Sequence, residues 1–209
     1  MEELRRLGVA RVPAVSVGDR VAHGWNPPEY AKLLDIPYVE RKVLAPAVLA
    51  ARLDTVLATA QSLVSQFDAH HAAHIPPERK RTVGDLGFHV FRLSLAFVDA
   101  MDRGEFPETW LLDASPADLV DGAAIARYGA LVRGRLTGWF EGAAPDEFER
   151  VIKVYYGPQT GHALLERTAW HAGQHLRQLY VLAERLGVNP SLPLPVEAFE
   201  GLPLPEAIW

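Results

Sequence analysis

The sequence predicts an all-α fold, a four-helix bundle with a small N-terminal αββα extension. Two observations lead to this prediction. Between residues 41 and 187, apolar side chains recur at spacings of three and four through four long segments, as on the buried faces of helices. Residues 1–40 instead combine short helical and alternating runs, and this stretch is too small to bury an apolar face of its own.

The length and composition fit one principal globular domain. The chain has 209 residues, of which 49% are hydrophobic and 22% are charged. We divide it into an extension at 1–40, the bundle at 41–187 and a proline-rich tail at 188–209. The tail holds five prolines, so we expect it to be extended on the surface or partly disordered.

The extension is expected to hold a hairpin between two short helices. Residues 1–8 are helix-like, and residues 12–17 and 20–23 alternate on either side of a Gly-Asp pair, which is typical of a hairpin. Asn26, followed by two prolines, marks the start of the second helix, which should stop near Pro37.

Capping and breaking residues bound the four long helices. The first should end before a Pro-Pro pair, the second begins with a capping box at Thr82 and ends at Gly104, and Gly187 closes the last. The expected spans are about 43–71, 82–103, 115–140 and 160–186. Residues 148–156, between the last two helices, should form a short strand or a loop.

Charge and composition exclude several classes of function. The 21 Lys and Arg against 26 Asp and Glu give a net charge of −5, so we expect no nucleic-acid partner. With no cysteine, the chain has no disulfide, no thiolate nucleophile and no Cys-ligated zinc or iron–sulfur cluster. No apolar run approaches the length of about 20 residues that spans a bilayer, and the charged start is unlike a signal peptide. We therefore expect a cytoplasmic protein with no membrane partner.

The strongest local signal is a pair of histidines four residues apart. His171 and His175 lie one above the other on a single helix face, where both imidazoles can reach one ion. That face points toward the apolar side and also includes Leu164, Thr168, Gln178 and Leu182. The spacing fits metal binding, and it also fits two hydrogen-bonded interior histidines or a partner surface.

A third ligand has to come from another helix, and His89 is the best candidate. It stands in the middle of the second helix among leucine and valine, whereas His70, His71 and His74 stand at a helix end expected to be solvated. Three imidazoles without a fourth protein ligand describe an open site for a divalent ion. We expect zinc or nickel first, with iron as an alternative.

Four side chains could support this site or bind a substrate. Asp85, one turn before His89, could ligate the ion or orient that histidine, but serving the helix start is the simpler role. Arg92 could fix an anionic group of a substrate, although a lone arginine is more often a surface residue. Thr168 and Gln178 could orient the ligands of the last helix. No residue is assigned as catalytic.

Residues from about 43 to 187 resemble the DinB-like superfamily, four-helix bundles with one histidine on the second helix and an HxxxH pair on the last. The matching motifs are Thr82-Val-Gly-Asp-Leu-Gly-Phe-His89 and Glu166-Arg-Thr-Ala-Trp-His-Ala-Gly-Gln-His175. The resemblance implies a divalent metal at His89, His171 and His175, with water completing the shell. It also implies a homodimer and, for members of known activity, use of a low-molecular-weight thiol such as mycothiol or bacillithiol.

The first 36 residues resemble, separately, the second half of a glutaredoxin-like domain, with Val12-Pro13 before its hairpin. The redox cysteines of such domains are absent, so the chain cannot exchange dithiols. We expect the fragment to serve as packing material or as a dimer contact. The alternative is a backbone edge at Val12 that pairs with a thiol peptide.

Three functional hypotheses follow. The first is a thiol-dependent transferase or isomerase, in which a bound ion lowers the pKa of a thiol or water and presents it to a small electrophile. The second is a non-catalytic stress protein that binds a metal or a small molecule. A general acid or base beside the ion would favour the first. The third is a metal-free bundle whose interior histidines pair with Asp85 and Gln178.

Overall fold

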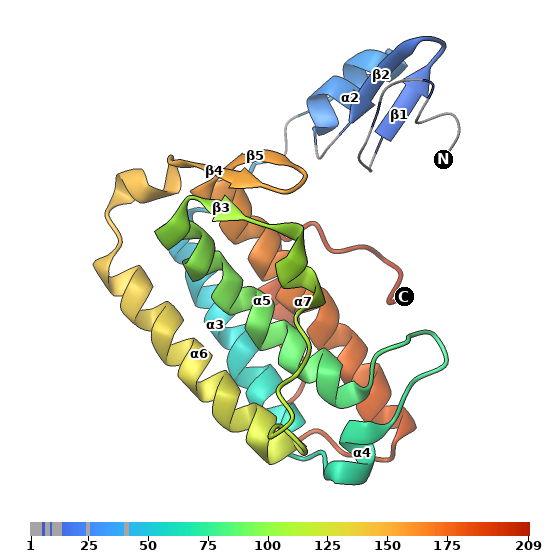
Figure 1. The fold of residues 1–209 in the computed structure, drawn as a ribbon, viewed down its shortest axis with the longest axis vertical. Helices are drawn as coiled ribbons and strands as arrows, with labels where there is room; N and C mark the ends of the chain where they lie inside the picture. The colour runs from blue at the N-terminus through green and yellow to red at the C-terminus, as the bar shows by residue number, and fades with distance from the viewer. Residues whose placement is uncertain (1–5, 7–8, 10–13, 24–25, 40–41) are drawn as a thin grey trace.

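The computed structural model describes residues 6, 9, 14–23, 26–39 and 42–209. Four long helices form a bundle (Figure 1), as predicted: α3 (Pro46–Val64), α5 (Val83–Arg103), α6 (Gly122–Gly142) and α7 (Gly161–Arg185). Around the bundle axis the helices follow the order α3, α7, α5, α6, and each packs mainly on its two neighbours. The second and last long helices, α5 and α7, therefore lie side by side.

The core lies along the axis of this bundle. Its largest fully buried side chains come from all four helices and from one strand: Phe91, Phe97, Leu49, Leu53, Leu57, Leu63, Met101, Ile125, Ile152, Leu164, Leu165 and Leu176. Burying each such side chain contributes about 1.5–3 kcal/mol. The apolar periodicity therefore identified the buried faces correctly.

From the sequence, no segment was expected to be long and apolar enough to span a membrane, but helix α3 meets this criterion. By length and composition alone, its 19 residues could cross a bilayer. Helices α7 and α6 both pack against it, and Leu49, Val56 and Leu57 are completely buried. Within the part of the chain that the structure describes, α3 thus lies in the bundle as a core helix.

The predicted ends of α5 and α7 agree with the structure. At the start of α5, the Thr82 hydroxyl accepts a hydrogen bond from the backbone N–H of Asp85 at 2.9 Å, and the Asp85 carboxylate accepts from the backbone of Thr82. Gly104 and Gly187 have positive φ, 77° and 72°, as expected of glycines that end helices.

Two helix boundaries were predicted wrongly. The first predicted helix is divided, because α3 ends at Val64 and a separate short helix, α4 (Ala69–Ala73), begins where Asp68 accepts from the backbone of His71 at 2.8 Å. The third helix begins at Gly122, where Asp121 caps it. The Ser-Pro pair at 115–116 starts only a turn, so local capping signals were mistaken for helix starts.

A small sheet at one end of the bundle was only partly expected. Its strands are β3 (Glu105–Phe106), β4 (Val151–Val154) and β5 (Gly157–Thr160), with β3 parallel to β4 and β4 antiparallel to β5. β4 falls in the stretch predicted as strand or loop. Short 3-10 helices follow β3, precede β4 and lie in the tail: η1 (Glu108–Leu112), η2 (Pro145–Phe148) and η3 (Val196–Phe199).

The N-terminal extension contains the predicted hairpin and second helix. Strands β1 (Ala14–Val17) and β2 (Arg20–His23) pair in antiparallel register, and α2 (Pro27–Leu34) begins where the Asn26 side chain accepts from a backbone N–H. Apart from Arg6, the expected first helix at 1–8 lies outside the described residues, as does the Val12-Pro13 turn. The resemblance to a glutaredoxin-like fragment stays unconfirmed.

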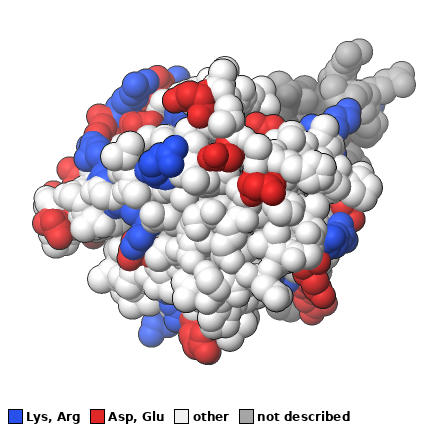
Figure 2. Space-filling view, turned by 90° about the horizontal axis from the view of Figure 1, so that it is seen from below, with Lys and Arg blue, Asp and Glu red and all other residues white. Residues whose placement is uncertain are grey.

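The tail runs back along the bundle. Helix η3 packs on α3, Ala198 and Leu202 are buried, and the chain ends beside α7 (Figure 1). At the opposite end from the sheet, Lys, Arg, Asp and Glu side chains are interspersed, and no patch of one sign covers that face (Figure 2).

We expect Gly122→Ala to destabilise the protein by roughly 1–3 kcal/mol or more. A methyl group at Gly122 would overlap the backbone oxygens of Val64 and Phe67, which cannot move independently of their segment. The matched control is Gly134→Ala in the same helix, where a methyl group meets nothing within 4 Å. This change should stabilise by about 0.5–1 kcal/mol through helix propensity. Urea denaturation measures both, and equal stabilities would contradict the packing at Gly122.

Candidate metal centre

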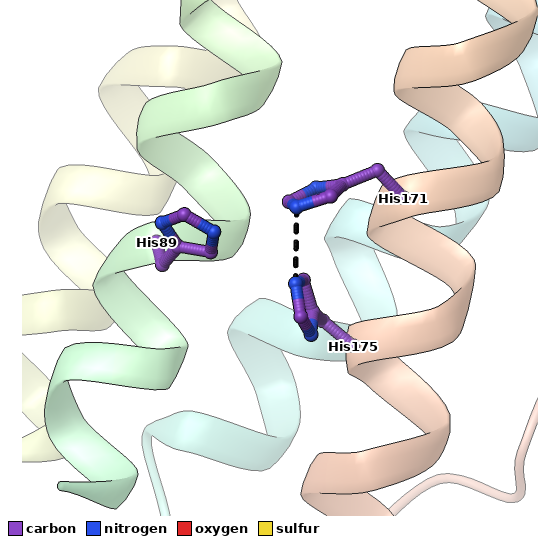
Figure 3. A group of neighbouring side chains, drawn as sticks. All are labelled: His89, His171 and His175. Atoms are coloured by element: carbon purple, nitrogen blue, oxygen red, sulfur yellow. Dashed lines mark hydrogen bonds between the residues drawn. The ribbon is translucent and has the colours of Figure 1, made fainter. Parts of the chain in front are cut away.

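Three histidines meet between α5 and α7 (Figure 3). His89 points from the middle of α5 toward His171 and His175, which lie one turn apart on α7. The two helices pack side by side, and the four-residue spacing puts both α7 rings on the face toward α5. The structure therefore brings together the three histidines singled out from the sequence.

The geometry of this group suits a shared ion. One nitrogen of each ring lies within 4.8 Å of the others. The Nε2 atoms of His171 and His175 are 3.0 Å apart, and the ring of His89 lies edge-on to both, at centroid distances of 5.1 and 5.3 Å. Two nitrogens bound to one tetrahedral ion at about 2.0–2.1 Å each lie roughly 3.3 Å apart. The distance of 3.0 Å between the Nε2 atoms of His171 and His175 is close to that value.

The tautomer of His175 is determined by a neighbouring amide. Its Nδ1 atom lies 2.7 Å from Oε1 of Gln178, and an amide oxygen can only accept, so Nδ1 carries the proton and donates it. The Nε2 atom, which faces His171, is then left with its lone pair. An imidazole held in this way by its second nitrogen is typical of metal ligands.

Burial keeps all three imidazoles neutral. It lowers the pKa of His89 to about 3 and, against a raising effect of the Gln178 hydrogen bond, the pKa of His175 to about 4. Burial also lowers the pKa of His171 well below 6.5, and the neighbouring histidines add to this effect. Neutral rings at pH 7 have lone pairs available for a metal.

Three arginines surround the histidines. The positive charges of Arg79 and Arg81 help to lower the pKa of His89 and of His175, and Arg167 acts in the same way on His171. Arg81 is anchored by a hydrogen bond to the carbonyl of Leu111 at 2.8 Å. A guanidinium does not accept protons, so these residues can attract or stabilise anions but cannot act as bases.

A cleft of about 210 Å³ lies beside α7, and none of the three histidines lines it. Its walls include Tyr156, Arg167 and Trp170, and Trp170 directly precedes His171 in the chain. The guanidinium of Arg167 lies over the ring of Tyr156 at 4.4 Å and donates to the hydroxyl of Tyr155 at 3.0 Å. The cleft therefore offers aromatic walls and two opposite charges, those of Arg167 and Glu166.

The donor set fits a divalent first-row ion. Three neutral imidazole nitrogens converge, and none of them is used by a fourth side chain. Imidazole suits zinc, nickel and iron, and the donor set alone does not choose among them. Among the residues that the structure describes, no further histidine, aspartate or glutamate joins the group, so a bound ion would keep positions open.

The other predicted site residues have different partners. The Asp85 carboxylate binds the hydroxyl and backbone of Thr82, so it serves the start of α5 and does not pair with the histidines. Arg92 forms ion pairs with Asp113 at 2.7 Å and Asp99 at 3.1 Å, so its guanidinium already has two carboxylate partners. The Thr168 hydroxyl donates to the carbonyl of Leu164 in its own helix.

The remaining histidines stay apart from the group. His71 in α4 pairs with Asp68 at 3.0 Å, and His70 and His74 are exposed at that helix, as predicted. His162 lies 2.7 Å from the carbonyl of Leu44. Arg79, Arg81 and Arg167 were missed because the first two stand in a loop of no regular pattern, while Arg167 lacked a motif of its own.

Comparisons with known proteins agree with the four-helix fold. The DinB superfamily model matches residues 52–179. The chain is similar to the solved structure of the DinB-like protein YjoA from Bacillus subtilis, with 17% identity and a TM-score of 0.57 over 69% of this chain and 95% of that one. YfiT from the same organism, described as a probable metal-dependent hydrolase with an unusual four-helix bundle topology, has 17% identity and a TM-score of 0.52. That similarity covers 74% of this chain and 96% of YfiT. A search of the curated proteins finds no match.

We expect the metal-free protein to lose stability as the pH falls from 7 to 4. The pKa of His89 is about 3 in the folded chain, against 6.5 for an ordinary histidine. Between these values the unfolded chain binds a proton that the folded chain does not, so a lower pH favours unfolding. His89→Gln removes a contribution of up to about 1.4 kcal/mol per pH unit and should flatten the dependence.

The measurement is the urea midpoint of chelator-treated protein across this pH range. His70→Gln, at an exposed position, is the control and should keep the steep dependence of the unmodified chain. An unchanged pH dependence in His89→Gln would show that His89 is not buried as a neutral ring.

Proposed function

Because the chain belongs to the DinB superfamily, whose model matches residues 52–179, we propose that it is a metal-dependent transferase or isomerase that uses a low-molecular-weight thiol on a small electrophile. The proposal rests on one observation, the open group of three neutral histidines. A divalent ion held there would act as a Lewis acid and lower the pKa of a thiol or water bound to it. His89, His171 and His175 would hold that ion, and Gln178 would keep His175 in the required tautomer.

The charges around the histidines favour thiol chemistry over hydrolysis. Activation of water is helped by a nearby base, and within the described part of the chain no carboxylate belongs to the histidine group. Arg79, Arg81 and Arg167 instead provide positive charge, which suits an electrophile that carries or develops negative charge. The cleft walled by Tyr156 and Trp170 could receive the organic part of such a substrate.

The alternative is a non-catalytic protein that binds a metal or a small molecule. The same lack of a base in the histidine group favours it, because proton transfer would depend on solvent. Metal-dependent hydrolysis, suggested by the description of YfiT, ranks lower because that similarity is one of fold at 17% identity. The homodimer, the cytoplasmic location and the choice of zinc or nickel over iron stay predictions.

Replacing His171 with alanine should abolish stoichiometric metal binding. The change removes one of three ligands and leaves two, which do not hold a divalent ion tightly. Elemental analysis of protein made without an affinity tag measures the result: about one equivalent in the unmodified chain and close to none in His171→Ala. His70→Ala is the control and should keep its metal. Full retention of metal in His171→Ala would contradict the ligand assignment.

The metal-loaded protein should transfer a low-molecular-weight thiol to an electrophile such as a maleyl or epoxide compound. We expect the rate to fall to the uncatalysed level after chelation, and to recover when zinc or nickel is added back. The assay follows loss of free thiol for a transfer, and conversion of the electrophile to its isomer for an isomerisation, in which the thiol is regenerated. Inactivity with several thiols, while the metal stays bound, would favour the non-catalytic binding protein.

A further inference from the structure

The last residues of the described chain lie along α7 beside the histidine group. The guanidinium of Arg177 donates to the carbonyls of Pro205 and Glu206 at 2.7 and 3.2 Å. The amide of Gln174 donates to the carbonyls of Ala207 and Ile208 at 3.2 and 2.8 Å. Two side chains of α7 thus bind four successive carbonyls and hold residues 205–208 in one register.

Contacts on either side hold this segment in place. Upstream, Phe199 and Leu204 lie over Gly173, which stands between His171 and His175. At the end, the ring of Trp209 lies 5.4 Å from the guanidinium of Arg79 and 5.7 Å from that of Arg185. Such cation–π contacts contribute about 0.5–1 kcal/mol each at exposed sites.

The carbonyl of Ile208 determines which way the amide of Gln178 points. It lies 2.6 Å from one end of that amide, and a carbonyl can only accept, so this end must be the NH2 group. The oxygen of the amide then faces Nδ1 of His175, at 2.7 Å. Nδ1 must therefore carry the proton, and Nε2 keeps its lone pair, with which it accepts a hydrogen bond from Nε2 of His171 at 3.0 Å and could bind an ion.

We propose that residues 205–209 act as a positioning element for the metal centre, holding His175 in its metal-binding tautomer through Gln178. The inference deepens the proposed function, because it explains how a metal-binding nitrogen is kept unprotonated. Without the Ile208 carbonyl, the Gln178 amide can rotate and offer its NH2 group to Nδ1. The proton of the neutral ring would then move to Nε2, the nitrogen that faces His171.

The first test measures the tautomer of His175 in the metal-free full-length chain at pH 7. Two-bond ¹H–¹⁵N NMR spectra distinguish a proton on Nδ1 from one on Nε2. The variant Gln174→Leu/Arg177→Ala removes the donors that hold the segment and leaves Gln178 and the histidines in place. Arg177→Ala alone is a milder second variant, in case the double change disturbs folding.

The reference variants lie on the same helix. Gln178→Leu removes the acceptor of the His175 proton and shows the NMR signal expected when nothing fixes the tautomer of His175. Tyr180→Phe removes a hydrogen bond to the carbonyl of Leu192, which lies in the tail but outside residues 205–209. It should behave as the unmodified chain does.

We expect the Nδ1–H tautomer in the unmodified chain and in Tyr180→Phe, and a mixture or the Nε2–H form in the two variants that release the segment. Affinity for Zn²⁺, measured by competition with a chromophoric chelator, should fall about 10–100-fold in the same two variants. An unchanged tautomer in both, with a changed one in Gln178→Leu, would overturn the proposal. If the unmodified chain binds no metal, the proposed function fails, but the tautomer measurement still tests the role of the segment.

Discussion

The burial of three uncharged imidazoles between α5 and α7 is the constraint on which this site depends. Charged rings could not be buried so close together, and burial accordingly lowers the pKa of each histidine. Neutral rings have unshared electron pairs, and one nitrogen of each ring lies within 4.8 Å of the others because two helices hold the rings there. Burying three polar side chains without partners costs free energy of folding. A divalent ion bound between them would supply that partner.

Residues around the histidines determine the charge near the site and the tautomer of His175. Arg79, Arg81 and Arg167 bring positive charge near a centre that would itself be positive when loaded, an arrangement that favours anionic ligands. Hydrogen bonds also run from Ile208 through Gln178 to His175. Loop, helix and tail are far apart in the sequence and act on the same three rings.

Much of the fold could be predicted because its signals are local. The apolar period of the long helices and the caps at Thr82 and Gly104 depend on residues within a few positions of one another. Local signals also gave two wrong helix boundaries. At Ser115 a capping motif starts only a turn, and near Asp68 the chain leaves α3 and begins α4. At Ser115 the local preference was not followed by a helix, whereas near Asp68 the local cap of α4 was overlooked.

By itself, the sequence determined the helix-forming segments, the pair of histidines one turn apart, and the lack of sulfur ligands. These properties follow from spacing and composition. Only the tertiary structure decided that α5 lies next to α7, which puts His89 opposite the pair, and that Arg92 is occupied by Asp99 and Asp113. It also decided that residues 205–209 reach Gln178. Contacts between distant segments depend on how helices pack in three dimensions, and no local pattern records that order.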